Sequence, residues 1–158
     1  MTKVQIAAVL AAVAMVGMPA WSAEVSYDFV ACSHSTQRML ETGPDLVAFG
    51  TEGWGIVSSS TTKDWESATT RCIGFLRIVG GKSVGKGMCR WVQAGGDTAV
   101  GEWEMMSSGE NTWTWIAGTG KLAGIKGSGT FQWTTRARAV EPGTGQSCRR
   151  DWGKYTLP

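Results

Sequence analysis

The sequence predicts an all-β protein, an antiparallel closed barrel of about eight strands with two disulfides, and leaves a β-sandwich as the alternative. Three observations support this prediction. Apolar and polar residues alternate along short segments that Gly-rich stretches separate, with no helical period of useful length. The chain has 22 glycines but only 4 prolines, and β-branched and aromatic residues are frequent. All 4 cysteines lie beyond residue 23, and an even number in an exported chain indicates disulfides.

Residues 1–23 are predicted to form a signal peptide. Lys3 gives a positive start, and Ile6 to Met18 is an uncharged apolar run. This run is shorter than the roughly 20 residues that a membrane-spanning helix needs. Pro19 ends it and small residues follow, so that cleavage after residue 22 or after residue 23 remains open. The protein is therefore expected to be secreted or periplasmic, with residues 24–158 as a single barrel domain and no membrane span.

The charge of the chain argues against nucleic acid as a partner. Its 15 Lys and Arg residues and 13 Asp and Glu residues give a formal net charge of +2, and loss of Lys3 with the signal peptide lowers this by one. Proteins that bind nucleic acid carry a strong positive field. Basic residues do gather beyond Gly118, but a strand sends consecutive charges to opposite faces, so a solvated face is expected there.

The N-terminal part of the domain is expected to hold short strands. These are Val25–Val30, Leu46–Thr51 and Gly53–Ser58, the last two as separate short strands or as a hairpin. Ser33–Arg38 is polar and is expected to be a loop or a short turn. The run of Ser and Thr at 58–62 is expected to be a loop.

A hairpin is predicted around Gly80-Gly81, which joins Thr69–Val79 to Ser83–Gln93. Two glycines permit a two-residue turn because both positions can take a positive φ. Val79 then pairs with Lys82, and this fixes the register of the two strands.

The same register predicts the disulfides. It places Cys72 directly opposite Cys89, where the two side chains are close enough to bond. Cys32 is left to pair with Cys148, which would tie the first strand region to the last. A zinc site is the competing interpretation, but the cysteines contain no C-x-x-C pair.

The clearest hairpin is expected between Thr98–Met106 and Asn111–Ala117, beyond a turn at 94–97. Apolar residues alternate with glutamates on its first strand and with threonines on its second. A three-residue loop, Ser108-Gly109-Glu110, would keep the glutamates and threonines together on the solvent-exposed face of the hairpin. The apolar pairs expected from this loop are Trp103 with Trp115 and Met105 with Trp113.

The C-terminal part is expected to complete the barrel. Polar and aromatic residues alternate in Thr130–Thr134, with Phe131 and Trp133 expected to face inward. A loop is expected within 139–146, and Arg149–Leu157 can form the last strand. A bond between the first and last strand regions is what barrel closure requires, so the barrel is preferred over the sandwich.

A glycine pattern adds a family resemblance. Gly118–Phe131 reads G-T-G-K-L-A-G-I-K-G-S-G-T-F and resembles the G-T-G-x-[LF]-x-G-[IA]-x-G-x-G-x-[FY] stretch of the allene oxide cyclase and dirigent barrel superfamily. The wider run Cys72–Trp133 resembles small exported bacterial proteins of unknown function with that barrel. The resemblance implies the barrel fold and a possible homo-oligomer, since related barrels form trimers. It implies cyclisation or stereochemical guidance of a metabolite only for the plant branches, whose catalytic residues have no match here.

No catalytic residue, metal site or cofactor is expected. His34 is the only histidine, and an exposed or capping role is expected for it rather than a place in a catalytic triad. Gly80-Gly81-Lys82-Ser83 lacks the earlier glycine that a phosphate-binding loop needs. Glu102 and Glu104 share one face of a strand, but that is the predicted wet face.

The expected function is that of a non-catalytic binding or interaction protein for a small apolar or aromatic ligand. An eight-stranded barrel encloses just enough space for side chains or for one small ligand. One alternative is a cyclase- or isomerase-like barrel that acts by cavity shape, with a polar group such as Arg71 or Arg90 inside. Another is a structural or surface-interaction protein. The candidate ligand-binding residues are Trp103, Met105, Trp113, Trp115, Phe131 and Trp133.

Overall fold

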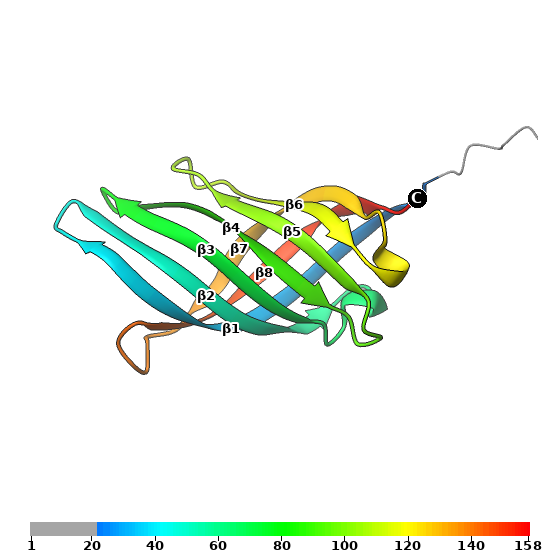
Figure 1. Cartoon of the computed structure of the whole chain (residues 1–158), viewed down its shortest axis with the longest axis horizontal. Helices are drawn as coiled ribbons and strands as arrows, with labels where there is room; N and C mark the ends of the chain where they lie inside the picture. The colour runs from blue at the N-terminus through cyan, green and yellow to red at the C-terminus, as the bar shows by residue number, and fades with distance from the viewer. Residues whose placement is uncertain (1–21) are drawn as a thin grey trace, which may run out of the picture.

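The computed structural model describes residues 22–158, so residues 1–21 of the predicted signal peptide lie outside the described part. Eight antiparallel strands form one closed barrel (Figure 1), which confirms the predicted fold class. Two short 3-10 helices, η1 (Lys63–Trp65) and η2 (Gly120–Leu122), lie in the connections β2–β3 and β6–β7. The strands are β1 (Glu24–Thr42), β2 (Leu46–Ser60), β3 (Thr69–Val79), β4 (Lys82–Val92), β5 (Thr98–Met105), β6 (Asn111–Gly118), β7 (Lys126–Arg136) and β8 (Thr144–Thr156).

Each strand pairs with the next along the chain, and β1 pairs with β8 to close the barrel. Both predicted disulfides form between directly opposed residues. Cys32–Cys148 joins β1 to β8, and Cys72–Cys89 joins β3 to β4 in the register that the Gly80-Gly81 turn predicted. The turn itself is as expected, because Gly80 and Gly81 have φ angles of 54° and 76°.

The barrel has two different ends (Figure 1). One end, here called the loop end, carries the four hairpin loops β1–β2, β3–β4, β5–β6 and β7–β8. The other, here called the helix end, carries η1, η2, the β4–β5 turn and the C-terminus. In the described residues no helix is both long and apolar enough to cross a membrane.

The first two strands are longer than predicted. Ser33–Arg38 was expected to be a loop or a short turn but lies within β1, where all six residues pair with β2 and the first four also pair with β8. The two short strands expected at 46–51 and 53–58 form the single strand β2, which runs through Gly53 and ends at Ser60. Pairing on both sides satisfies the backbone groups of these segments, and this outweighs their weak strand propensity.

The β5–β6 hairpin has the predicted faces but a different register. Trp103 pairs with Trp113, not with Trp115, so the ladder is shifted by two residues. The Met106 backbone N–H donates to the Glu110 carbonyl oxygen at 2.9 Å, which leaves a three-residue loop one position earlier than expected. The reason is Gly109, whose φ of 90° suits the last position of such a loop. A shift of two residues keeps every side chain on its predicted face.

Aromatic side chains fill the barrel at the helix end. Trp65 of η1 and Leu122 of η2 are buried and close that end. Trp65 stacks on Trp115, with ring centroids 4.9 Å apart. The core aromatics of this half are Tyr27, Phe29, Trp65, Trp91, Trp113, Trp115 and Tyr155.

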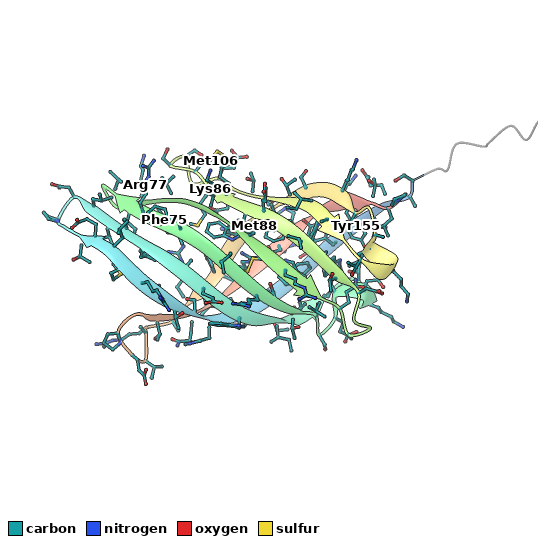
Figure 2. The ribbon with its side chains drawn as sticks, viewed as in Figure 1. Phe75, Arg77, Lys86, Met88, Met106 and Tyr155 are labelled. Carbon is teal, nitrogen blue, oxygen red and sulfur yellow. A yellow bond between two sulfur atoms is a disulfide. The ribbon has the colours of Figure 1, made fainter. Side chains whose placement is uncertain are left out.

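Apolar residues also occur on the outer wall. Phe75 and Met88 project from β3 and β4 beside Arg77 and Lys86 (Figure 2), and they are 43% and 40% exposed. Ser33, in contrast, faces the interior. Hydrophobicity alone therefore does not distinguish the inner from the outer face of this barrel.

Candidate ligand-binding cavity

The half of the barrel toward the loop end is hollow. It contains a cavity of about 460 Å³ that side chains from β1, β2, β3, β4, β5, β7 and β8 line. Met39 and Arg136, which are exposed, lie at its mouth near the loops β1–β2 and β7–β8. The buried ring of Trp91 lies at the inner limit, where the packed aromatic core begins. The interior is thus divided into a packed half and an open half.

One wall of the cavity is apolar. Trp103 and Met105 of β5 and Phe131 and Trp133 of β7 contribute four of the six predicted ligand-binding residues. Phe131 and Trp133 meet edge to face, with ring centroids 6.1 Å apart. The remaining apolar residues of this wall are Val47, Phe49, Leu76 and Ile78.

A polar part of the lining comes from β1, β2 and β8, and β8 pairs with β7 in the barrel. Its side chains are hydroxyls and one amide, and they are half-buried. The Ser35 hydroxyl donates a long hydrogen bond of 3.4 Å to the Gly145 carbonyl oxygen. This wall, here called the polar strip, comprises Ser33, Ser35, Gln37, Thr51, Thr144 and Ser147.

Arg149 of β8 lies at the floor of the cavity. Its guanidinium carbon is 4.9 Å from the ring centroid of Phe131, 5.6 Å from that of Trp113 and 5.8 Å from that of Trp91. Its Nε donates a 3.0 Å hydrogen bond to Oδ2 of Asp151, which lies behind it and does not line the cavity. A positive charge is thereby held against three aromatic faces, an arrangement that favours a cation.

Burial controls the protonation of the groups below the floor. Asp151 is 1% exposed, and burial raises its pKa to about 6, although the charge and hydrogen bond of Arg149 partly oppose this. Burial and then the charge of Asp151 raise the pKa of Tyr27 well above its usual value, so this phenol stays neutral. Asp151 can therefore change charge near neutral pH, whereas Tyr27 cannot.

The interior disulfide belongs to the same cavity. Cys72 lines it, while Cys89 is 1% exposed and packs in the core. The Thr70 hydroxyl lies 3.6 Å from the Cys72 sulfur. The other disulfide, Cys32–Cys148, joins outward-facing positions of β1 and β8, where Cys32 lies 3.8 Å from the Ser58 hydroxyl.

Two of the predicted ligand-binding residues lie elsewhere. Trp113 and Trp115 face the interior, but they are 1% and 2% exposed in the packed half and do not line the cavity. Glu102 and Glu104 lie on the outer wall opposite threonines, as their alternation predicted. His34 is also outside, and its Nδ1 is 3.2 Å from the Gln146 amide nitrogen.

Sequence reasoning missed the polar side of the cavity. Arg71 and Arg90, suggested as interior polar groups, are exposed, and Arg149 takes the interior position. Residues inside and outside this part of β1 are both polar, so alternation gave no signal there. In β8, Arg149 and Asp151 alternate with Arg150 and Trp152, so both faces of the strand carry charge. The sequence therefore does not show which of these charged residues face inward unless the orientation of β8 is known.

Residues 22–158 contain no group of three or more His, Cys, Asp or Glu side chains that could hold a metal ion. The charged groups near the cavity are the Arg149–Asp151 pair at the floor and Arg136 at the mouth. The lining offers a ligand aromatic contacts, hydrogen bonds and the positive charge of Arg149.

Two solved structures of pterocarpan synthase dirigent proteins, GePTS1 and PsPTS1, are similar to this chain. Each aligns with a TM-score of 0.49 at 9% sequence identity. The alignments cover 87% and 88% of this chain and 94% and 97% of the two dirigent chains. These neighbours belong to the superfamily that the glycine pattern of Gly118–Phe131 resembles. No protein-family model matches the chain, and no curated protein matches it.

Proposed function

We propose that this barrel binds one small, largely aromatic molecule in the cavity at its loop end. The observation that carries the proposal is the 460 Å³ space that aromatic residues and the polar strip line together. Small-molecule sites are typically concave, mostly apolar and supplied with a few polar groups, with volumes of about 300–1,000 Å³. Trp103, Phe131 and Trp133 supply flat apolar contacts, and the polar strip supplies hydrogen bonds that orient the ligand.

We further propose that the protein acts outside the cytoplasm. The predicted signal peptide directs export, and disulfides such as Cys32–Cys148 and Cys72–Cys89 persist in oxidising compartments. Both cysteine pairs would be reduced in most cytosols, and the barrel would lose the disulfide between β1 and β8.

The binding proposal is tested by filling the cavity. Ser35 faces the cavity from the middle of β1, whereas Thr36 beside it faces solvent. The neutral fluorophore N-phenyl-1-naphthylamine is titrated while its emission and the tryptophan emission are followed. Ser35→Phe is expected to weaken binding by about tenfold or more, since the new ring occupies the space, and the matched control Thr36→Phe is expected to bind like the wild type. Equal binding by both variants, or no binding by the wild type, would contradict the proposal.

A second function, guided cyclisation or isomerisation, is favoured by the Arg149–Asp151 pair. Arg149 could stabilise negative charge that develops on a ligand oxygen, and its Nε–H, bound to Asp151, holds the guanidinium in place. A ligand recovered from the purified protein would decide between the two functions. Recovery of an unchanged ligand after prolonged incubation supports binding alone, whereas a new isomer that Arg149→Gln fails to form supports catalysis.

A further inference from the structure

Arg149 has more hydrogen-bond donors than the protein uses. The residue is only 8% exposed, and its Nε–H is bound to Asp151. A guanidinium carries five N–H donors, and no other hydrogen bond joins this one to any residue in 22–158. Below it lie aromatic faces, which accept no conventional hydrogen bond, and above it lies the cavity. The free donors therefore point to a ligand that brings its own acceptor.

We propose that the ligand is an aromatic molecule with a carboxylate, which the guanidinium of Arg149 binds at the floor of the cavity. This inference rests on the proposed binding function and specifies the ligand class. Arginine presents parallel N–H groups that match the two oxygens of a carboxylate. The ring system of the ligand would then lie along Trp103, Phe131 and Trp133 toward the mouth.

The polar strip refines the ligand class. It lies on strands next to the aromatic residues of β7 and offers hydroxyl groups from β1, β2 and β8. Hydroxyls both donate and accept hydrogen bonds, so they suit a ring that carries hydroxyl or ether oxygens better than a plain hydrocarbon. An aromatic acid with oxygen substituents on one edge of its ring fits both walls.

Asp151 couples this binding to pH. An ionised Asp151 already balances the charge of Arg149, so a bound carboxylate would place a second negative charge beside the pair. The other groups around Asp151 are the neutral phenol of Tyr27 on β1 and the rings of its cross-strand partners Phe29 and Phe131. Oδ1 of Asp151 has no hydrogen-bond partner among the described residues, so Arg149 is the donor that the ionised carboxylate has. Ligand binding should therefore favour protonation of Asp151.

The experiment compares 1-naphthaleneacetate with the neutral 1-naphthaleneacetamide by isothermal titration calorimetry of the wild-type protein. At about pH 5.5 the acid is expected to bind about tenfold more tightly than the amide. At about pH 8 the affinity for the acid is expected to fall about fivefold, because Asp151 is ionised there, while that for the amide stays the same.

Three variants locate the effect. Arg149→Gln is expected to remove the preference for the acid and to keep amide binding. Asp151→Asn is expected to keep the preference and to remove its pH dependence. Arg150→Gln, the matched control, alters the neighbouring arginine, which lies on the outer wall and pairs with Asp28, and is expected to behave like the wild type.

The outcomes separate this inference from the proposed function. Equal affinity of the wild type for acid and amide at about pH 5.5 would overturn the inference, and no variant is needed to see it. A preference for the acid that survives in Arg149→Gln would overturn it as well. Binding of neither compound, together with no binding of N-phenyl-1-naphthylamine, would instead overturn the proposed function.

Discussion

The indole rings of Trp65 and Trp115 are stacked in the barrel interior, with an interplanar angle of 17° and ring centroids 4.9 Å apart. Trp115 belongs to the wall of the barrel, but Trp65 belongs to η1 in the β2–β3 connection. Trp65 is fully buried and also packs against Phe29, Trp91 and Tyr155. A side chain from a connecting segment therefore completes the core of the packed half, and the cavity that Arg149 lines lies in the other half.

This stack leads to a prediction about stability. Trp65→Ala removes a fully buried indole and is expected to lower the free energy of unfolding by about 3–5 kcal/mol. Urea denaturation followed by circular dichroism measures the change. Trp54→Ala is the matched control, because Trp54 is 45% exposed on the outer wall of β2 and its loss is expected to cost far less. Equal losses for the two variants would show that Trp65 does not complete the core.

A second prediction concerns the close contact between Trp113 and Gly101. A Cβ added at Gly101 would lie only 2.2 Å from Cζ2 of the Trp113 ring. Gly101→Ala therefore forces the indole or the strand to move, and it is expected to destabilise the protein by about 1–3 kcal/mol. Gly95→Ala is the control, because a Cβ there meets no atom within 4 Å, and its expected change is about 0.5 kcal/mol or less. Thermal unfolding of both variants under the same conditions provides the comparison.

The parts of the fold that sequence reasoning predicted are those in which local chemistry determines geometry. Gly80 and Gly81 determine a two-residue turn, and that turn alone places Cys72 opposite Cys89. Alternation likewise assigned Trp103 to the interior and Glu104 to the exterior, although the register of that hairpin was wrong by two residues. A shift of two residues leaves each side chain on the same face of the strand, but it changes which residues are paired across the hairpin.

The polar half of the site could not be predicted in this way. Ser33 and Gln37 alternate with residues that are also polar, so no hydrophobic pattern marks their face. They become interior residues only because β1 pairs with both β2 and β8. Arg149 faces inward because Cys148 beside it must face outward to reach Cys32 on the outer wall. This position depends on contacts between distant parts of the chain.

The two disulfides are predicted to differ in their contribution to stability. Cys32–Cys148 links residues 116 apart in the sequence, and Cys72–Cys89 links residues 17 apart. In the chain-entropy model the longer loop contributes about 5 kcal/mol and the shorter loop about 3 kcal/mol. Cys32→Ala with Cys148→Ala is therefore expected to lower the free energy of unfolding more than Cys72→Ala with Cys89→Ala. Urea denaturation under non-reducing conditions measures both.

The location of Cys72–Cys89 allows a check on this comparison. Its sulfurs lie inside the barrel, so replacing them also removes buried atoms, and this loss adds to the cost of the shorter loop. A larger loss for the interior pair would mean that packing around Cys89 outweighs loop closure. Reduction of Cys72–Cys89 in the Cys32→Ala, Cys148→Ala variant, which has no other disulfide, keeps both interior sulfurs and measures loop closure separately.

The last prediction concerns Asp151 and the dependence of stability on pH. Its pKa is about 6 in the folded protein and 3.8 when unperturbed, so the folded state holds this proton more tightly than the unfolded chain. The stability that this carboxyl contributes is therefore fully present below about pH 4 and is lost as the pH rises to about 6. The loss is on the order of 3 kcal/mol, since one pKa unit corresponds to about 1.4 kcal/mol.

Asp151→Asn isolates this effect, because the amide oxygen can still accept the Arg149 hydrogen bond but has no charge to gain. The variant's free energy of unfolding, relative to the wild type, is expected to rise by about 3 kcal/mol between about pH 4 and pH 8. Any pH-independent cost of leaving Arg149 without its counter-charge cancels in that change.

Asp28→Asn supplies a control of opposite sign. Its hydrogen bond to Arg150 lowers the pKa of Asp28, so its stabilisation is lost only as the pH falls below about 4. A flat difference between wild type and Asp151→Asn across this range would mean that the Asp151 carboxyl has an ordinary pKa in the folded barrel, and the proposed coupling between ligand binding and pH would lose its titrating group.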